Sequence, residues 1–330
     1  MVTICVDAMG GDSGYEVVLE GIAEALEEDS QLSVLVAGPD NIIAPFCDSH
    51  ERAMPLVCTE VIEMGEHPAT AVRSKKESTI VRGCVSVRHG DADGFFSAGS
   101  TGAILVAASL NVGRIKGVKR PALATAIPGA TGRKTVMLDM GANADVSNDA
   151  IVQFAHMGRA YSKVALGVGA PNVALLSNGE EESKGSEMAL DYHRSLKEAS
   201  DGWFVGNAEG TDLLAGRYDV IVCDGYTGNV AVKTIEGTAK FIVGRVKDAT
   251  AASKRSAAGA LLLKPALKSV AAELSGDEYG GAVLLGLKAP VIIGHGATSA
   301  LAVKNGALVC ARAVRENLVG KIADAVQVAE

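Results

Sequence analysis

Short apolar runs alternate along the chain with longer segments in which apolar residues recur every three or four positions. Residues 2–6 and 32–36 are continuous runs rich in Val, Ile and Leu, which is typical of strands buried on both faces of a sheet. Residues 15–26 and 187–199 have helical spacing. This alternation predicts an α/β fold, an αβα sandwich around a mostly parallel, twisted sheet with right-handed crossovers.

The same pattern predicts further elements. Strands are expected at residues 56–62, 93–97, 135–138, 173–176, 203–205, 219–223 and 291–293. Helices are expected at residues 41–46, 101–108, 148–166, 225 to about 246, and from about 299. From about residue 251 to 276 Ala-rich and Leu-rich pieces indicate a helical excursion from the sheet. No linker divides the chain, so we expect a single domain over residues 1–330.

Two glycine turns between a strand and a helix share one pattern. Gly99-Ser100-Thr101-Gly102 and Gly225-Tyr226-Thr227-Gly228 each follow a strand that an aspartate opens at the same offset. The first N–H groups of a helix lack internal partners and carry partial positive charge, so such turns can bind phosphate. Each turn could instead be architectural, with Ser or Thr capping the helix. The repetition favours the functional interpretation.

Other polar turns follow other predicted strands. They contain Gly10, Gly11 and Asp12; Asn143; Lys184; and Gly294, His295 and Gly296. Ligands of open α/β folds bind along this edge of the sheet. His295 could serve a site or only its turn. Lys233, four residues after Asn229, could serve a site or lie on a solvated helix face.

Composition narrows the class of protein. The chain has 48% hydrophobic residues, 4% aromatics and 38 glycines, which suits Val/Ile/Leu strands joined by glycine turns. A net charge of -8 argues against nucleic acid as a general partner. The six cysteines are scattered without C-x-x-C spacing, so we interpret them as reduced core residues of a cytosolic protein.

Several motifs are absent from the sequence. No signal peptide is expected, because the amino terminus lacks a basic region and reaches Asp7 after six residues. No apolar run is long enough to span a bilayer. There is no G-x-S-x-G, Walker A, G-x-G-x-x-G after a strand, or H-E-x-x-H, so esterase, P-loop and zinc-protease functions lose their usual support. We expect no metal and no cofactor.

Several segments together carry a family resemblance: V-D-A-M-G-G-D, S-A-G-S-T-G-A, L-D-M-G-A-N-A-D, N-G-E-E-E-S-K-G, V-G-N-A-E-G, C-D-G-Y-T-G-N-V-A-V-K and Y-G-G-A-V-L-L-G. In this order and spacing the chain resembles the bacterial phosphate acyltransferase (PlsX) family from end to end. The resemblance implies a fold similar to phosphotransacetylase and isocitrate dehydrogenase. It also implies transfer of a fatty acyl chain from acyl carrier protein to inorganic phosphate, giving acyl phosphate for phospholipid synthesis, by a homodimer whose product a glycerol-3-phosphate acyltransferase uses.

The chain departs from the family pattern at two places. Members usually have Asn at the position of Ser100, and usually a Pro within residues 13–16. Because serine can still donate and cap, we expect the first change to tune phosphate binding. The second is expected to alter only the start of a helix.

The chemistry of this reaction needs no catalytic triad. Phosphate is already an anionic nucleophile and a thiol is a good leaving group, so positioning and oriented donors can supply the catalysis. We predict phosphate-binding residues Gly10, Gly11, Asp12, Gly99, Ser100, Thr101, Gly102, Gly225, Thr227 and Gly228. We predict catalytic residues Asn143, Lys184, Asp224, Asn229 and His295, with Asn or Lys donors at the oxyanion and Asp224 orienting donors.

The predicted excursion suggests a second contact surface. Leu261, Leu262 and Leu263 are expected in a loop before Pro265, close to Lys264 and Lys268. These residues could insert reversibly into an anionic membrane, dock acidic acyl carrier protein, or lie buried against the body. The first two uses need not conflict, and insertion into the membrane would make the protein cytoplasmic and peripherally membrane-associated.

Two other functions fit parts of the sequence. A nicotinamide-dependent hydroxy-acid dehydrogenase would need an acidic metal cluster and an adenosine-ribose acid, and the sequence offers neither. A non-catalytic adaptor between acyl carrier protein and the membrane would not need so many polar turns on one sheet edge.

Overall fold

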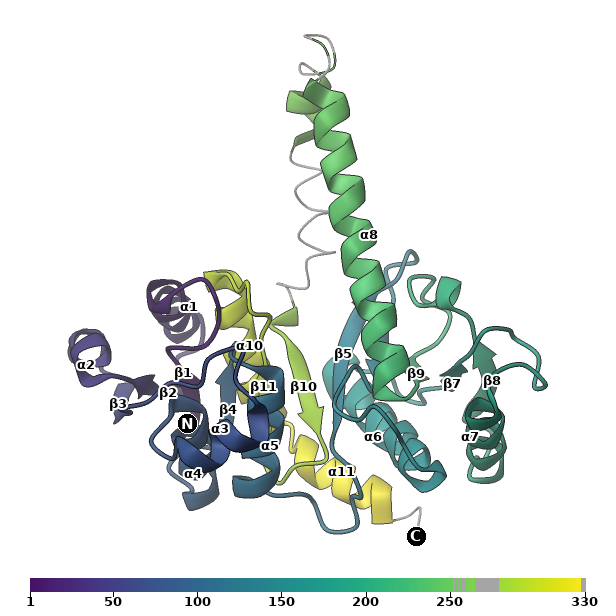
Figure 1. Cartoon of the computed structure of the whole chain (residues 1–330), viewed down its shortest axis with the longest axis horizontal. Helices are drawn as coiled ribbons and strands as arrows, with labels where there is room; N and C mark the ends of the chain where they lie inside the picture. The colour runs from purple at the N-terminus through teal and green to yellow at the C-terminus, as the bar shows by residue number, and fades with distance from the viewer. Residues whose placement is uncertain (252, 254–255, 257–258, 265–278, 328–330) are drawn as a thin grey trace.

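The computed structural model describes residues 1–251, 253, 256, 259–264 and 279–327. Its strands form one 11-stranded sheet in the order β3-β2-β1-β4-β11-β10-β5-β6-β9-β7-β8 (Figure 1). The strands are β1 (Val2–Asp7), β2 (Leu32–Gly38), β3 (Ala53–Val57), β4 (Gly94–Ser97), β5 (Ala122–Pro128), β6 (Lys134–Leu138), β7 (Val173–Leu176), β8 (Phe204–Ala208), β9 (Val220–Val222), β10 (Ala282–Leu285) and β11 (Val291–Ile293). The prediction of a single domain stays a prediction.

The sheet is mostly parallel, as the alternation of strands and helices predicts. The exceptions are β5 and β10 in the middle of the sheet: β10 is antiparallel to both β11 and β5, and β5 is antiparallel to β6. The sequence pattern predicted neither strand. They join the two parallel halves of the sheet.

Helices cover both faces of the sheet, which confirms the αβα sandwich. They are α1 (Tyr15–Glu28), α2 (Asp40–Ser49), α3 (Pro68–Ser74), α4 (Thr79–His89), α5 (Thr101–Asn111), α6 (Asn148–Leu166), α7 (Glu187–Glu198), α8 (Gly225–Ala251), α10 (Ala300–Arg315) and α11 (Leu318–Gln327). In β1, Ile4 and Val6 pack into the core with α1, α6, α10 and α11, and Cys5 packs into the core with α3, α4 and α5. Alternate residues of a buried strand thus serve two cores.

Several boundaries differ from the prediction. Strand β3 begins at Ala53, earlier than the expected residues 56–62. The expected final helix is two helices, α10 and α11, because the chain turns at Asn317, whose φ is 51°. Residues 259–264, which include the three leucines, are helical rather than a loop.

Helix α8 leaves the body of the molecule. It has 27 residues, about 40 Å of helix, and projects well beyond the sheet (Figure 1). Residues 241–249 are all exposed, so the excursion begins inside this helix and not at residue 251. Lys268 lies outside the described residues, as does most of the predicted excursion. Within the described part of the chain, none of the helices combines the length and hydrophobicity needed to cross a membrane.

Candidate active site

Three turns at strand ends pack against one another. The N–H of Asp12, in the turn after β1, donates to the carbonyl of Gly296, after β11, at 2.7 Å. A side chain at Gly10 would place its Cβ 2.8 Å from the backbone nitrogen of Gly99, after β4. Only glycine permits this approach, so the predicted residues Gly10 and Gly11 hold the turns together and Asp12 lines the cavity between them.

The turn between β4 and α5 leaves its helix end open. Ser97 Oγ donates to Asp7 Oδ2 at 2.7 Å and accepts from the Gly99 N–H at 3.0 Å, and these bonds fix the turn against the end of β1. Burial raises the pKa of the Asp7 carboxyl. Ser100 is the N-cap residue, but its side chain makes no capping hydrogen bond, contrary to expectation. The first turn of α5 can therefore bind an anion, and Gly99, Thr101 and Gly102 line the cavity.

The turn between β9 and α8 differs, although its sequence predicts an equivalent site. Asp224 Oδ1 accepts from the Thr227 N–H at 2.8 Å, and Oδ2 accepts from the Thr227 hydroxyl at 2.7 Å. The helix end thus already holds a carboxylate. A Cβ at Gly228 would lie 1.9 Å from the Asp139 carbonyl oxygen, and one at Gly225 would lie 2.5 Å from that of Asn143. These glycines are needed for packing, and the geometry does not favour phosphate binding here.

The loop after β6 is held by one buried carboxylate. Asp139 accepts backbone N–H groups from Leu123, Gly141, Ala142 and Asn143. Burial raises the pKa of this carboxyl. The Asn143 amide donates to Asp139 Oδ2 and to the Pro121 carbonyl, each at 2.8 Å. Because these bonds occupy its donors and it does not line the cavity, the structure gives no support to Asn143 as an oxyanion donor.

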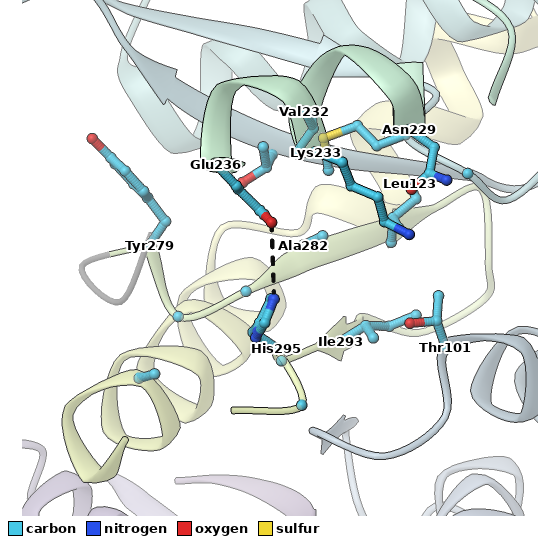
Figure 2. Close-up of a pocket in the computed structure, with 18 of the residues that line it drawn as sticks. Thr101, Leu123, Asn229, Val232, Lys233, Glu236, Tyr279, Ala282, Ile293 and His295 are labelled. Atoms are coloured by element: carbon cyan, nitrogen blue, oxygen red, sulfur yellow. Dashed lines mark ion pairs between the residues drawn. The ribbon is translucent and has the colours of Figure 1, made fainter. Parts of the chain in front are cut away.

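A cavity of about 690 Å³ lies over β5 and β10, between α5 and α8. Figure 2 shows Lys233 and Asn229 on its α8 wall, with the Lys233 side chain directed towards Thr101. No ion pair involves Lys233, and no hydrogen bond involves the Asn229 side chain, within the described residues. Both therefore offer donors to a ligand.

His295 lies on the opposite wall of the cavity, where it both stabilises its turn and faces the site. Its Nδ1 accepts from the Ala297 N–H at 3.2 Å, which is a turn role. Its Nε2 lies 4.0 Å from Glu236 Oε2 across the cavity (Figure 2). Both residues line the cavity, so His295 also faces the site.

Two of the remaining predicted residues line a different cavity. Asp224 and Thr227 line a space of about 330 Å³ with residues of β7 and α7. Lys184 is exposed in the loop beside it, where its carbonyl accepts from Ser177 Oγ at 3.4 Å. The structure thus divides the predicted catalytic set, with Asn229 and His295 in the larger cavity. In the part of the chain that is described, no cluster of three or more His, Cys, Asp or Glu side chains could hold a metal.

Sequence reasoning considered Lys233 without placing it in the site, and it missed Glu236. Asn229, Lys233 and Glu236 are spaced i, i+4 and i+7, which puts polar side chains on one helix face. That spacing is the signal that could have found the α8 wall.

The fold places the chain among the phosphotransacetylase-like α/β proteins. A phosphotransacetylase from Streptococcus pyogenes matches with a TM-score of 0.64 and 16% identity, over 96% of this chain and 94% of that one. The expected similarity to isocitrate dehydrogenase stays a prediction.

The family follows from closer relatives. A family model described as "Fatty acid synthesis protein" matches residues 2–321. The phosphate acyltransferase of Limosilactobacillus reuteri is 45% identical over 307 residues, 92% of this chain and 90% of that protein. The phosphate acyltransferase of Heliobacterium modesticaldum is 42% identical over 324 residues, 97% of this chain and 96% of that protein. The chain belongs to the phosphate acyltransferase family and is an acyltransferase, not a dehydrogenase or an adaptor.

Proposed function

We propose that the protein transfers a fatty acyl chain from acyl carrier protein to inorganic phosphate and releases acyl phosphate for phospholipid synthesis. The observation that carries this proposal is the open N-terminus of α5 at a cavity that Lys233 also faces. A helix N-terminus and a lysine both favour a phosphate anion. Membership in the phosphate acyltransferase family supports phosphate as the acceptor.

In the proposed reaction, the first turn of α5 and Lys233 hold phosphate. A phosphate oxygen attacks the thioester carbonyl, and the Asn229 amide donates to the oxygen that becomes negative. The tetrahedral intermediate collapses as the C–S bond breaks. Phosphate gives its proton to the departing thiolate, so a C–O bond replaces the C–S bond and no external base is needed.

A covalent acyl-enzyme is not part of this mechanism. All six cysteines are buried, and burial raises the pKa of the Cys58 thiol to about 12 and that of Cys223 well above its ordinary value. Such thiols are protonated at neutral pH and are poor nucleophiles. Direct attack by phosphate therefore fits the described cysteines better than a two-step transfer.

The projecting end of the molecule is the proposed contact with carrier protein and membrane. Leu261, Leu262 and Leu263 are 71%, 84% and 59% exposed, so the alternative in which they pack against the body receives no support. Lys264 and Lys247 are also exposed there. Inserted leucines would contribute roughly 1.5 to 3 kcal/mol each and nearby basic residues about 1 kcal/mol each, before ordering costs. Reversible attachment follows, and the same basic residues can dock acidic acyl carrier protein.

We also infer two partners from the family. A homodimer is proposed, and a glycerol-3-phosphate acyltransferase is proposed as the enzyme that consumes acyl phosphate. Both rest on the family and not on a contact in this chain.

The test is to incubate the purified protein with acyl-acyl carrier protein and phosphate and to measure acyl phosphate and free carrier thiol in equal amounts. Failure to form acyl phosphate with properly folded protein overturns the proposal. In the variant Asn229→Leu, we expect kcat to fall about 100- to 1,000-fold with little change in KM for phosphate. A normal kcat would remove Asn229 from the oxyanion role.

A further inference from the structure

The large cavity has one polar side and one apolar side. Its ionisable lining residues, within the described part of the chain, are Asp12, Lys233, Glu236, Tyr279 and His295, which come from the turns, from α8 and from the segment before β10. None comes from β5. The β5 residues in the lining are almost all apolar, and this strand forms a continuous wall.

The β5 wall follows from the alternation of side chains along the strand. Leu123, Thr125 and Ile127 lie on the same face of β5, since side chains alternate along a strand. Leu123 and Ile127 belong to the core on the α5 and α8 side of the sheet, where Val232 and Ile235 of α8 pack against it. The sheet and the helix thus enclose the apolar part of the cavity between them.

The β5 wall leads away from the proposed reaction site. At its near end, the Met140 N–H donates to the Leu123 carbonyl at 3.0 Å, which ties β5 to the loop beside Asn229. At its far end, the Ala130 N–H donates to the Leu214 carbonyl at 2.7 Å, and Leu214 joins the cavity lining. The four steps from Leu123 to Ile127 span about 13 Å.

We propose that the β5 wall binds the acyl chain of the substrate and that Ile127 and Leu214 limit its length. The proposal rests on the proposed function, since it assigns the carbonyl carbon to the polar side near Thr101 and Lys233. A fatty chain is the ligand that fits, because the wall carries no charge, Thr125 is its one polar side chain, and its apolar residues favour each methylene that they remove from water. The longest acyl chain that fits is then set by the side chains at the far end of β5.

Leu214 offers the sharper test of this assignment. It is 36% exposed, so a larger side chain there is tolerated better than at the buried Ile127. In Leu214→Trp, we expect kcat/KM for a long acyl donor to fall about tenfold relative to a donor two methylenes shorter. Leu214→Ala should shift the preference towards longer chains. The matched control is Leu110→Trp, since Leu110 is 60% exposed on α5 and does not line the cavity.

A binding measurement separates this proposal from the proposed function. A fluorescent long-chain fatty acid is titrated into each variant without carrier protein or phosphate, and its affinity should fall about tenfold in Leu214→Trp and stay unchanged in Leu110→Trp. If acyl phosphate forms but the length profile and probe affinity of both Leu214 variants match the wild type, the β5 assignment is wrong. If the probe result holds and no donor yields acyl phosphate, the proposed function is wrong and the binding wall stands.

Discussion

The Asp224 carboxylate accepts from the Thr227 N–H at 2.8 Å and from the Thr227 hydroxyl at 2.7 Å, and this pair of bonds distinguishes two turns whose sequences look equivalent. Asp224 occupies the helix end that phosphate would need. The turn before α5 has Ala98 at the corresponding position of the pattern, and α5 begins two positions later in the pattern, after Ser100, whose side chain makes no capping hydrogen bond. The same Gly-x-Thr-Gly pattern thus gives a closed helix end in one place and an open one in the other.

Thr227→Val should affect stability and not phosphate binding. The variant keeps the shape of the side chain but removes the hydroxyl bond to Asp224, so we expect a loss of about 0.5 to 2 kcal/mol in the free energy of unfolding. Urea denaturation measures this loss, and steady-state kinetics should give an unchanged KM for phosphate. A large rise in that KM, with stability unchanged, would show that the β9–α8 turn takes part in phosphate binding.

Lys233→Met should weaken phosphate binding directly. A hydrogen bond between charged groups contributes about 1.5 to 3 kcal/mol, so KM for phosphate should rise about 10- to 150-fold while the protein stays folded. Kinetics at varied phosphate measure the change. Lys163→Met is the matched control, because Lys163 is exposed on α6 outside the cavity and should leave the KM as it is. Equal KM values in the two variants would place Lys233 on a solvated helix face after all.

The buried carboxyl of Asp7 predicts a pH dependence of stability. Burial raises its pKa in the folded state above the value in the unfolded chain. The folded state then holds its proton more tightly, so this contribution to stability is present at low pH and lost as the pH rises through the folded-state pKa. Asp7→Asn has no charge to bury and should escape the loss.

Urea titrations from about pH 4 upward check this prediction. The unfolding free energy of Asp7→Asn relative to the wild type should increase with pH in this window. Asp201→Asn, at an exposed position, serves as the control and should follow the wild-type slope. A difference between Asp7→Asn and the wild type that does not vary with pH would show that Asp7 does not titrate in this way.

The sequence predicted much of the fold because buried parallel strands and amphipathic helices have strong patterns. Strand β5 was missed because residues 122–128 are Ala-rich and end at Pro128, which weakens the strand signal. Yet this antiparallel strand forms the apolar wall of the cavity. The closed helix end at Asp224 was missed for another reason: the Gly-x-Thr-Gly pattern does not include the residue before it, although Asp224 and Thr227 have the spacing of a helix cap.

Leu262→Glu should release the protein from anionic vesicles while turnover of soluble substrate survives. Leu262 is the most exposed of the three leucines at 84%, so the change should cost little folding free energy. A glutamate there loses the insertion of an apolar side chain and adds repulsion from anionic lipid. Flotation with vesicles that contain anionic lipid, at low and high salt, measures the binding. Leu110→Glu is the matched control, since it adds the same charge at an exposed leucine of α5. If Leu262→Glu stays bound to the vesicles, or both variants are released alike, the leucines do not form the membrane contact.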